Sequence, residues 1–581
     1  MAVALVVAGC TSTGPKSSEE QRFRKLADAF SAGHHAAQPA AAVALGLHAY
    51  DGRCVVPDRA FVRGDIARLE RFSSAFAALS PEGLSSAARH DRRLLLAILE
   101  GQRFQAEAMR PYEANPMTYA SYLDVSFYLK RDWKPLPDRV RDMTAILRQA
   151  PALFAVARVQ LDRVLARPFV ETAIQIAGST ATFLEDDIAK AGRDCGDPVV
   201  AGGFNVALVA AAKEHRAFAE WLRRDRLPVA TGKFALGADA YARMLRGELI
   251  DLPPAKILEL GMKELRAEQA RFDEAARLID PARPAIEVFK AIQKDHPTEQ
   301  GLLPDTRKNL EAIRQFVVDR RLVTIPSEVR ATVTETLPPF RATSFASMET
   351  PGPFETKSTE AFYYVTPVEA GWPPAQKEEW LTAFNYYTTD VVSIHEAYPG
   401  HYVQFLALNA SKASAVAKVF SSYAFVEGWA HYCEKMLLDE GFGQPVSPAT
   451  ASREEMVRAA KYRLAQSDEA LLRVCRLCVS VQMHCDGMTL EQGAKFFRDN
   501  CHHEEKPAYQ EALRGTFDPG YCFYTLGKLQ LLKLRSDWQA QEGPAFSLLR
   551  FHDEVLRHGM PPVRLLREAM LKDASQHAEL F

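Results

Sequence analysis

The sequence predicts a mainly α-helical fold with one small β-sheet, and three observations support this. From about residue 20 to 280, apolar residues recur every three or four positions, the period of one helix face. Residues 452–455 (Ser-Arg-Glu-Glu) and 489–492 (Thr-Leu-Glu-Gln) have the form of capping boxes that open helices. In contrast, residues 330–336 alternate and are β-branched, and residues 361–367 are aromatic and β-branched. These two segments predict strands.

Length and composition are those of a globular protein of more than one domain. The chain has 581 residues, of which 47% are hydrophobic and 25% charged. We expect a signal and tether at 1–20, an N-terminal helical region at 21–300 and a catalytic region at 301–581, although the last two could form one continuous body. The formal net charge is -2. Without a basic excess or a Lys/Arg stripe, nucleic-acid binding is not expected.

The N-terminus resembles a bacterial lipoprotein signal. A short apolar stretch leads into Val-Ala-Gly-Cys10, and a polar Ser/Thr/Gly segment follows. We therefore expect Cys10 to carry a lipid, the following residues to form a flexible tether, and the protein to be anchored in the bacterial cell envelope. Thr11 favours the periplasmic face of the outer membrane. The alternative is a chance Ala-Gly-Cys in an ordinary N-terminus.

Two of the nine cysteines form a Cys-x-x-Cys, at Cys475 and Cys478. No second pair stands at zinc-finger spacing, and the surrounding pattern is helical. We therefore expect these thiols to be small buried apolar groups.

The segment His395-Glu396-Ala-Tyr-Pro-Gly-His401 is the strongest candidate for chemistry. A hydrolytic zinc site needs three protein ligands and a nearby carboxylate that acts as base toward water. In the common His-Glu-x-x-His helix, the two histidines are four residues apart on one face. Here they are six apart, which on a regular helix turns them roughly 240° away from each other. Pro399 and Gly400 stand between them and can break the helix. We expect this break to bring both histidines to one zinc ion, with Glu396 as the base.

Glu427 is the expected third ligand. It begins a helical pattern 26 residues after His401, and a carboxylate on the next helix completes the site in one large class of zinc peptidases. The alternative is a capping or solvated carboxylate. His431 and Glu434 lie one and two turns further on and could share its face. We expect His431 to face the substrate or to support a ligand.

The sequence His-Glu-Ala-Tyr-Pro-Gly-His-Tyr-Val-Gln at 395–404, followed by Glu-Gly-Trp-Ala-His-Tyr-Cys-Glu at 427–434, resembles the bacterial family catalogued as domain of unknown function 885. The resemblance extends over most of the chain, and its specific motifs lie between residues 360 and 540. Many members are lipoproteins, and the family is grouped with helical zinc peptidases of the gluzincin type. The resemblance implies a large helical zincin-like metallopeptidase fold, a small sheet beside the metal-binding helix, and zinc as cofactor.

Two further segments match that family. The helix from Arg476 to His484 resembles one that carries an Arg and a later His, but Ser480 stands where the family usually has Asp. The segment that starts at Tyr524 resembles a Tyr-x-x-Gly motif, and Arg535 lies beyond it. By analogy with related peptidases, His484 or Tyr524 would hydrogen-bond the developing oxyanion. Arg476 or Arg535 would pair with a substrate carboxylate, the alternative being structural ion pairs.

The strand predicted at 362–366 lies just before the metal-binding helix along the chain. In zinc peptidases an edge strand beside this helix pairs with the extended substrate backbone. We therefore expect this strand to lie at the edge of the sheet and Tyr364 to contact the substrate.

The function expected first is that of a zinc-dependent metallopeptidase. Glu396 would assist the attack of water on peptide bonds of short or unstructured peptides in the cell envelope. A second possibility is an amidase-type zinc hydrolase acting on cell-wall peptides. A third is a non-catalytic metal-binding or scaffold lipoprotein, against which the intact Glu396 argues.

Overall fold

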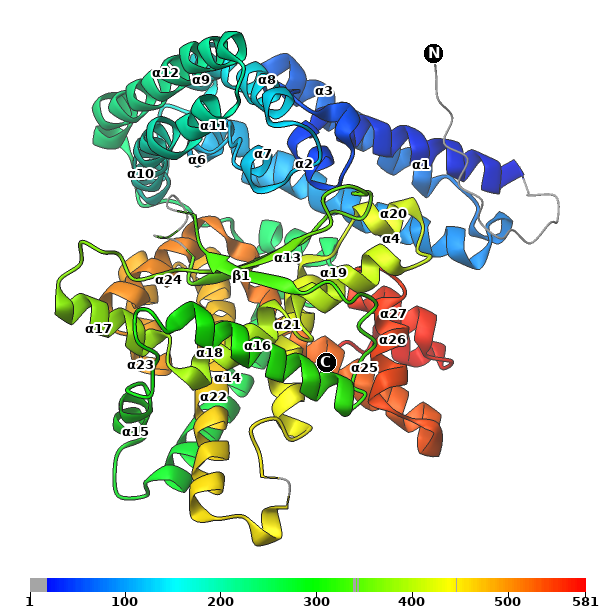
Figure 1. Cartoon of the computed structure of the whole chain (residues 1–581). Coiled ribbons are helices and arrows are strands. Elements are labelled where there is room, and N and C mark those ends of the chain that lie inside the picture. Colours follow the sequence, from blue (N-terminus) through cyan, green and yellow to red (C-terminus); the bar gives the residue numbers. More distant parts are fainter. Residues whose placement is uncertain (1–17, 338–340, 342–343, 446) are drawn as a thin grey trace.

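Helices make up most of the chain, and one small sheet lies among them, which confirms the predicted mainly α class (Figure 1). The computed structural model describes residues 18–337, 341, 344–445 and 447–581. Cys10 and nearly all of the predicted signal lie outside these residues. Among the helices that are described, none combines the length and apolar character needed to cross a bilayer.

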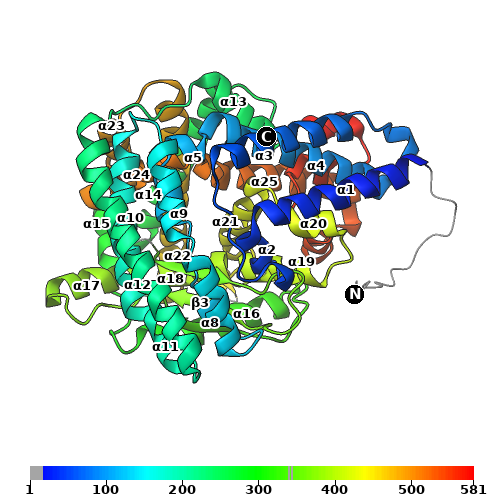
Figure 2. The same cartoon turned by 90° about the horizontal axis from the view of Figure 1, so that it is seen from above.

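The first layer is built by helices of the N-terminal part, which lie above the rest of the chain (Figures 1 and 2). The three-to-four spacing of Phe23, Ala27 and Phe30 turns one face of α1 inward, where all three are buried. The helices of this layer are α1 (Ser18–Ala37), α2 (Pro39–Ala44), α3 (Arg59–Ala77), α4 (Ser86–Phe104), α5 (Pro111–Ala114), α6 (Met117–Ala120), α7 (Phe127–Lys130), α8 (Leu136–Leu147), α9 (Ala150–Gln160), α10 (Arg167–Phe183), α11 (Ala189–Asp194) and α12 (Pro198–Trp221).

The next four helices lie on both sides of the domain boundary expected near residue 300. They are α13 (Ala238–Gly247), α14 (Pro254–Ile279), α15 (Ala285–Ile292) and α16 (Leu302–Asp319). Helix α14 packs along α22 (Arg453–Cys485), far away in sequence. The approach is close, because a Cβ added to Gly261 would lie 2.0 Å from the Leu477 side chain. Part of the expected N-terminal region therefore shares a core with the C-terminal region.

The described residues form a three-stranded sheet in the order β1-β3-β2. Strands β1 (Ala331–Glu335) and β3 (Ala361–Val365) are parallel, and β2 (Ala346–Glu349) pairs antiparallel with β3. The two predicted strands are thus confirmed. The expectation that the strand at 362–366 lies at an edge is wrong, because β3 is central and its backbone is paired on both sides. The edge nearest residues 395–401 is β2, which contacts α18 (Tyr386–Glu396) and α19 (His401–Ala410).

Two of the C-terminal helices, α21 (Tyr423–Asp439) and α22, pack against α18. Both predicted capping boxes are confirmed, at Ser452 for α22 and Thr489 for α23. Cys475 and Cys478 are buried in α22, and the cysteines in the described part of the chain are all free thiols. The remaining helices are α17 (Pro374–Ala383), α20 (Ala415–Val419), α23 (Leu490–Cys501), α24 (Glu505–Phe517), α25 (Phe523–Glu542), α26 (Leu548–Leu556) and α27 (Val563–Met570).

Candidate metal centre

The break between α18 and α19 is located at the Pro-Gly pair. Helix α18 ends at Glu396, the Tyr398–Pro399 peptide bond is cis, and α19 begins at His401. A Cβ on Gly400 would lie only 1.8 Å from the carbonyl oxygen of His395, so no other residue fits without moving the backbone. The break brings the rings of His395 and His401 to a centroid distance of 4.9 Å, at right angles to each other.

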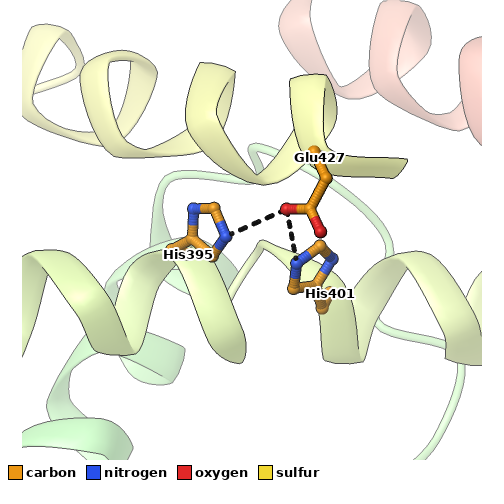
Figure 3. A group of neighbouring side chains, drawn as sticks. All are labelled: His395, His401 and Glu427. Atoms are coloured by element: carbon orange, nitrogen blue, oxygen red, sulfur yellow. Dashed lines mark ion pairs between the residues drawn. The ribbon is translucent and has the colours of Figure 1, made fainter. Parts of the chain in front are cut away.

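Glu427, on α21, faces both histidines (Figure 3). Its Oε2 lies 3.5 Å from His395 Nε2 and 3.4 Å from His401 Nε2. Two ligands bound tetrahedrally to one zinc at normal bond lengths are about 3.3 Å apart, close to these separations. Two imidazoles and one carboxylate are also the donor set of a class of catalytic zinc sites. The three side chains therefore fit a zinc ion.

The electrostatics of Glu427 agree with that fit. Its Oε2 is buried and makes no hydrogen bond within the described residues. Burial alone would raise the pKa of Glu427, but the adjacent His401 and His395 outweigh burial and hold it well below the usual range. Glu427 is thus a carboxylate that is kept charged and whose buried oxygen points at two ring nitrogens.

Glu434 fixes the orientation of the first histidine. One of its oxygens lies 2.7 Å from His395 Nδ1, so His395 Nδ1 is engaged while Nε2 faces Glu427. Arg473 Nη2 lies 3.2 Å from the same oxygen, and His431 Nδ1 lies 3.1 Å from the other. Burial would raise the pKa of Glu434, but Arg473 and His431 lower it far below its usual value. His431 thus supports a metal-facing residue through Glu434.

Glu396 follows the first histidine directly. Burial raises the pKa of its carboxyl, and Glu427 adds to this, whereas His395 and His401 oppose it. The described residues offer Glu396 no hydrogen-bond partner, so its carboxylate is free to take a proton. A half-buried acid with a raised pKa beside a metal-type cluster has the character of a general base.

Tyr524, at the start of α25, lies beside His395. The two rings stack at a centroid distance of 6.3 Å. The guanidinium carbons of Arg476 and Arg514 lie 5.3 Å and 5.8 Å from the Tyr524 ring centre, and Tyr423 lies 6.0 Å away. Burial and Glu427 raise the pKa of Tyr524, so its hydroxyl stays protonated and can donate a hydrogen bond.

Helices α21 and α25 touch through their backbones at two glycines. A Cβ on Gly428 would lie 2.5 Å from the carbonyl carbon of Gly527, and one on Gly527 would lie 1.8 Å from the Ala424 carbonyl oxygen. The Gly in Glu-Gly-Trp and the Gly in Tyr-x-x-Gly are therefore partners in one contact. This contact sets how close Tyr524 comes to Glu427.

Two residues predicted for the site are engaged elsewhere. His484 Nε2 donates to the carbonyl of Gly515 at 2.8 Å, and burial lowers the pKa of its imidazole to about 4. It packs against Tyr241, so its contacts are those of a neutral core histidine. Arg535 contacts the Tyr432 hydroxyl and Glu440. The prediction of either residue as a group that touches substrate finds no support in these contacts.

Arg476 and Tyr364 also have partners within the protein. Both oxygens of Glu511 bind Arg476, at 2.7 Å and 2.8 Å, so Arg476 is an ion-pair partner that flanks Tyr524. Tyr364 lies in the central strand with Lys130 over its ring. Its expected substrate contact depended on an edge position that the strand does not have.

The sequence reasoning missed Arg473, Arg514 and Tyr423. Arg473 stands three residues before Arg476 on α22, and Tyr423 stands four residues before Glu427 on α21. Each of these two residues therefore lies one helical turn before a predicted site residue, and this spacing could have indicated them. Arg514 carried no such signal.

Comparisons with known proteins identify the family and the fold of this chain. The family model described as "Bacterial protein of unknown function (DUF885)" matches residues 39–570. No curated protein matches the chain significantly. A solved structure of a candidate lipoprotein of unknown function from Shewanella oneidensis is 23% identical, with a TM-score of 0.76 over 95% of this chain and 100% of that one. A candidate lipoprotein from Colwellia psychrerythraea is 17% identical, with a TM-score of 0.80 over 96% and 99% of the two chains. At these identities the likeness concerns the fold.

Proposed function

This chain belongs to the DUF885 family of bacterial proteins of unknown function, and we propose that it is a zinc-dependent metallopeptidase of short or unstructured peptides. The observation that carries the proposal is the convergence of His395, His401 and Glu427, whose ligand atoms all lie within 4.8 Å of one another. Glu396 beside them supplies the base that a merely structural metal site does not need.

His395, His401 and Glu427 would hold the zinc. When bound, zinc supplies a Lewis acid that lets water ionise near neutral pH and that polarises a carbonyl group. Glu434 and Arg473 keep the His395 ring oriented, with Nε2 facing Glu427.

The acid–base work falls to Glu396. Its carboxylate would take a proton from the water that attacks the peptide carbonyl carbon. The same proton would then pass to the departing amide nitrogen as the C–N bond breaks, so that an amine and a carboxylate leave. The Tyr524 hydroxyl, beside His395, is our candidate donor to the carbonyl oxygen as that oxygen gains negative charge.

The edge strand β2 is the candidate for holding the substrate backbone. It contacts both helices that carry the histidines, and no further strand pairs with its outer side in the part of the chain that is described. An extended peptide could add to that edge through main-chain hydrogen bonds.

We also propose that the protein works in the bacterial cell envelope, anchored by a lipid on Cys10. Two observations support this location: the Val-Ala-Gly-Cys10 sequence and the description of both structural neighbours as candidate lipoproteins. The periplasmic face of the outer membrane is the finer form of this proposal.

The metal and the base can be tested together on residues 18–581. We expect about one zinc per chain by elemental analysis and none in His395→Ala. Glu396→Gln should keep the zinc but lose peptide hydrolysis by at least about 100-fold, because the general base is gone. Glu379→Gln, at an exposed glutamate of α17, is the control and should behave like the parent. Unchanged turnover in Glu396→Gln would refute the mechanism, and absence of zinc after reconstitution would refute the metal site.

A further inference from the structure

The guanidinium of Arg514, close to the candidate metal centre, can form further hydrogen bonds. Arg514, near the end of α24, directs Nε and Nη2 to a single oxygen of Asp518, at 3.0 Å and 2.9 Å. Its Nη2 also lies 3.4 Å from the Tyr423 hydroxyl. None of these three hydrogen bonds uses Nη1, the Tyr524 side chain also hydrogen-bonds the guanidinium, and a third of the Arg514 side chain is exposed. Arg476 differs, because two of its nitrogens bind the two oxygens of Glu511 and only 11% of its side chain is exposed.

Arg514 is held in place by groups from three helices. Asp518 at the end of α24 anchors its guanidinium, and Tyr423 of α21 touches both groups through its hydroxyl. The Tyr524 ring of α25 lies beside Arg514 and also beside Arg476 of α22. A cation fixed by aromatic rings and a carboxylate loses little freedom when it binds a further anion.

The position of Arg514 relates it to the candidate metal ligands. Its guanidinium lies 5.8 Å from the Tyr524 ring, which lies 6.3 Å from the His395 ring. Arg514 is therefore at most about 12 Å from His395, a span of roughly three extended residues. An anion bound by Arg514 would belong to the same peptide whose backbone is cleaved at the metal.

We propose that Arg514 binds the free C-terminal carboxylate of the substrate and that the protein acts as a carboxypeptidase, releasing one to about three residues. This inference rests on the function proposed above and specifies its substrate class. A carboxylate fits better than a phosphate group, because Asp518 and Glu511 lie close by and would repel a dianion more strongly than a single charge.

The test compares N-acetylated peptides of identical sequence that end in a free acid or in an amide, as a mixture of sequences followed by mass spectrometry. The free acids should be shortened from the C-terminus, and the amides at least about 10-fold more slowly. Arg514→Gln should lower kcat/KM for the acids by about 10- to 100-fold, the value of a charged hydrogen bond, and should abolish the preference for acids. Arg498→Gln is the matched control, because Arg498 is exposed to a similar degree and also pairs with a carboxylate of α24, that of Glu505.

Binding provides a readout that does not depend on turnover. In the Glu396→Gln background, isothermal titration should show tighter binding of the acid than of the amide, and Arg514→Gln should remove the difference while zinc content and circular dichroism stay unchanged. If acid and amide are hydrolysed equally well, the carboxylate site is refuted while the peptidase function stands. If no peptide is hydrolysed but binding still prefers the acid through Arg514, the peptidase function fails and the carboxylate site stands. If neither cleavage nor binding distinguishes the two, the inference is overturned.

Discussion

At the scale of single residues, His395 and His401 meet because the chain between them abandons helical geometry. Pro399 supplies no backbone donor, and Gly400 occupies a position where the His395 carbonyl leaves no room for a side chain. The approach of His395 and His401 therefore depends on the absence of a side chain at Gly400.

Gly400→Ala should weaken zinc binding. The added methyl group would lie 1.8 Å from the His395 carbonyl oxygen, so the backbone must shift and carry His401 away from Glu427. We expect at least a 10-fold loss of zinc affinity, measured by competition with a chromogenic chelator, since even a small misplacement of a ligand weakens a metal site. Gly371→Ala is the control, because a Cβ there meets nothing within 4 Å. Circular dichroism shows whether the variant folds, and a folded Gly400→Ala that binds zinc like the parent would contradict this account.

Sequence reasoning succeeded at this scale where a local pattern carried the chemistry. Residues 395–401 contain both histidines, the base and the reason for the break, so their geometry could be anticipated. The further hydrogen-bonding capacity of Arg514 depends on Asp518 and Tyr423, and no spacing rule connects these to the histidines. The contacts of His484 could not be anticipated for the same reason, because its partner is a backbone carbonyl on another helix.

At the scale of elements, α21 is positioned by its first turn. Ser422 caps the helix by accepting from Phe425 N at 3.0 Å, and the Glu248 carboxylate contacts both the Ser422 hydroxyl and Tyr423 N. Burial raises the pKa of Glu248 to about 7, although the hydrogen bonds from Ser422 and Tyr423 act in the opposite direction. The helix that carries Glu427 thus begins on a carboxyl group that titrates near neutral pH.

Replacing Glu248 by Gln should change how stability depends on pH. Because the folded pKa is above that of the unfolded chain, the contribution of Glu248 is fully present below about pH 4.5 and is lost as the pH rises through about 7. Over that window the parent should lose on the order of 3 kcal/mol of unfolding free energy relative to Glu248→Gln. Urea denaturation of both proteins at pH 5 and pH 8 measures the difference. A constant offset at the two pH values, as expected for Glu259→Gln on the exposed face of α14, would contradict the prediction.

The elements themselves were predictable to different degrees. The capping boxes of α22 and α23 are local and were found from four residues each. Strand β2 was missed because Ala-Ser-Met-Glu lacks the β-branched and aromatic residues that mark strands. Without β2, the central strand β3 was taken for an edge, and the expected substrate contact of Tyr364 lost the edge position on which it depended.

At the scale of the whole molecule, a buried ion cluster joins segments far apart in the chain. Lys528 of α25 lies 2.9 Å from Glu268 and 3.1 Å from Glu264, both of α14. Burial would raise the pKa of Glu268, but Lys528 and Arg271 lower it. The partners are 260 residues apart, which is why the boundary expected near residue 300 could not reveal that both helices belong to one core.

Lys528→Met should be strongly destabilising because it removes one of the two cations that lie 2.9 Å from the buried Glu268 carboxylate, the other being Arg271. We expect a loss of about 3 to 5 kcal/mol in unfolding free energy, and a partial recovery when Glu268→Met is added. The control is Lys533→Met on the same helix, whose more exposed pair with Asp537 should contribute about 1 kcal/mol or less. Guanidinium denaturation followed by circular dichroism measures all three, and equal losses in the two lysine variants would contradict the argument.

The backbone contact between Gly428 and Gly527 has a consequence for protein engineering. Since neither helix has a side chain between them at that point, the distance between α21 and α25 is already at its minimum and can only be increased. A library meant to alter substrate preference should therefore leave both glycines unchanged, because any larger residue at the crossing would separate Tyr524 from Glu427. The positions to vary are Tyr423 and Arg514, whose side chains lie beside the Tyr524 ring.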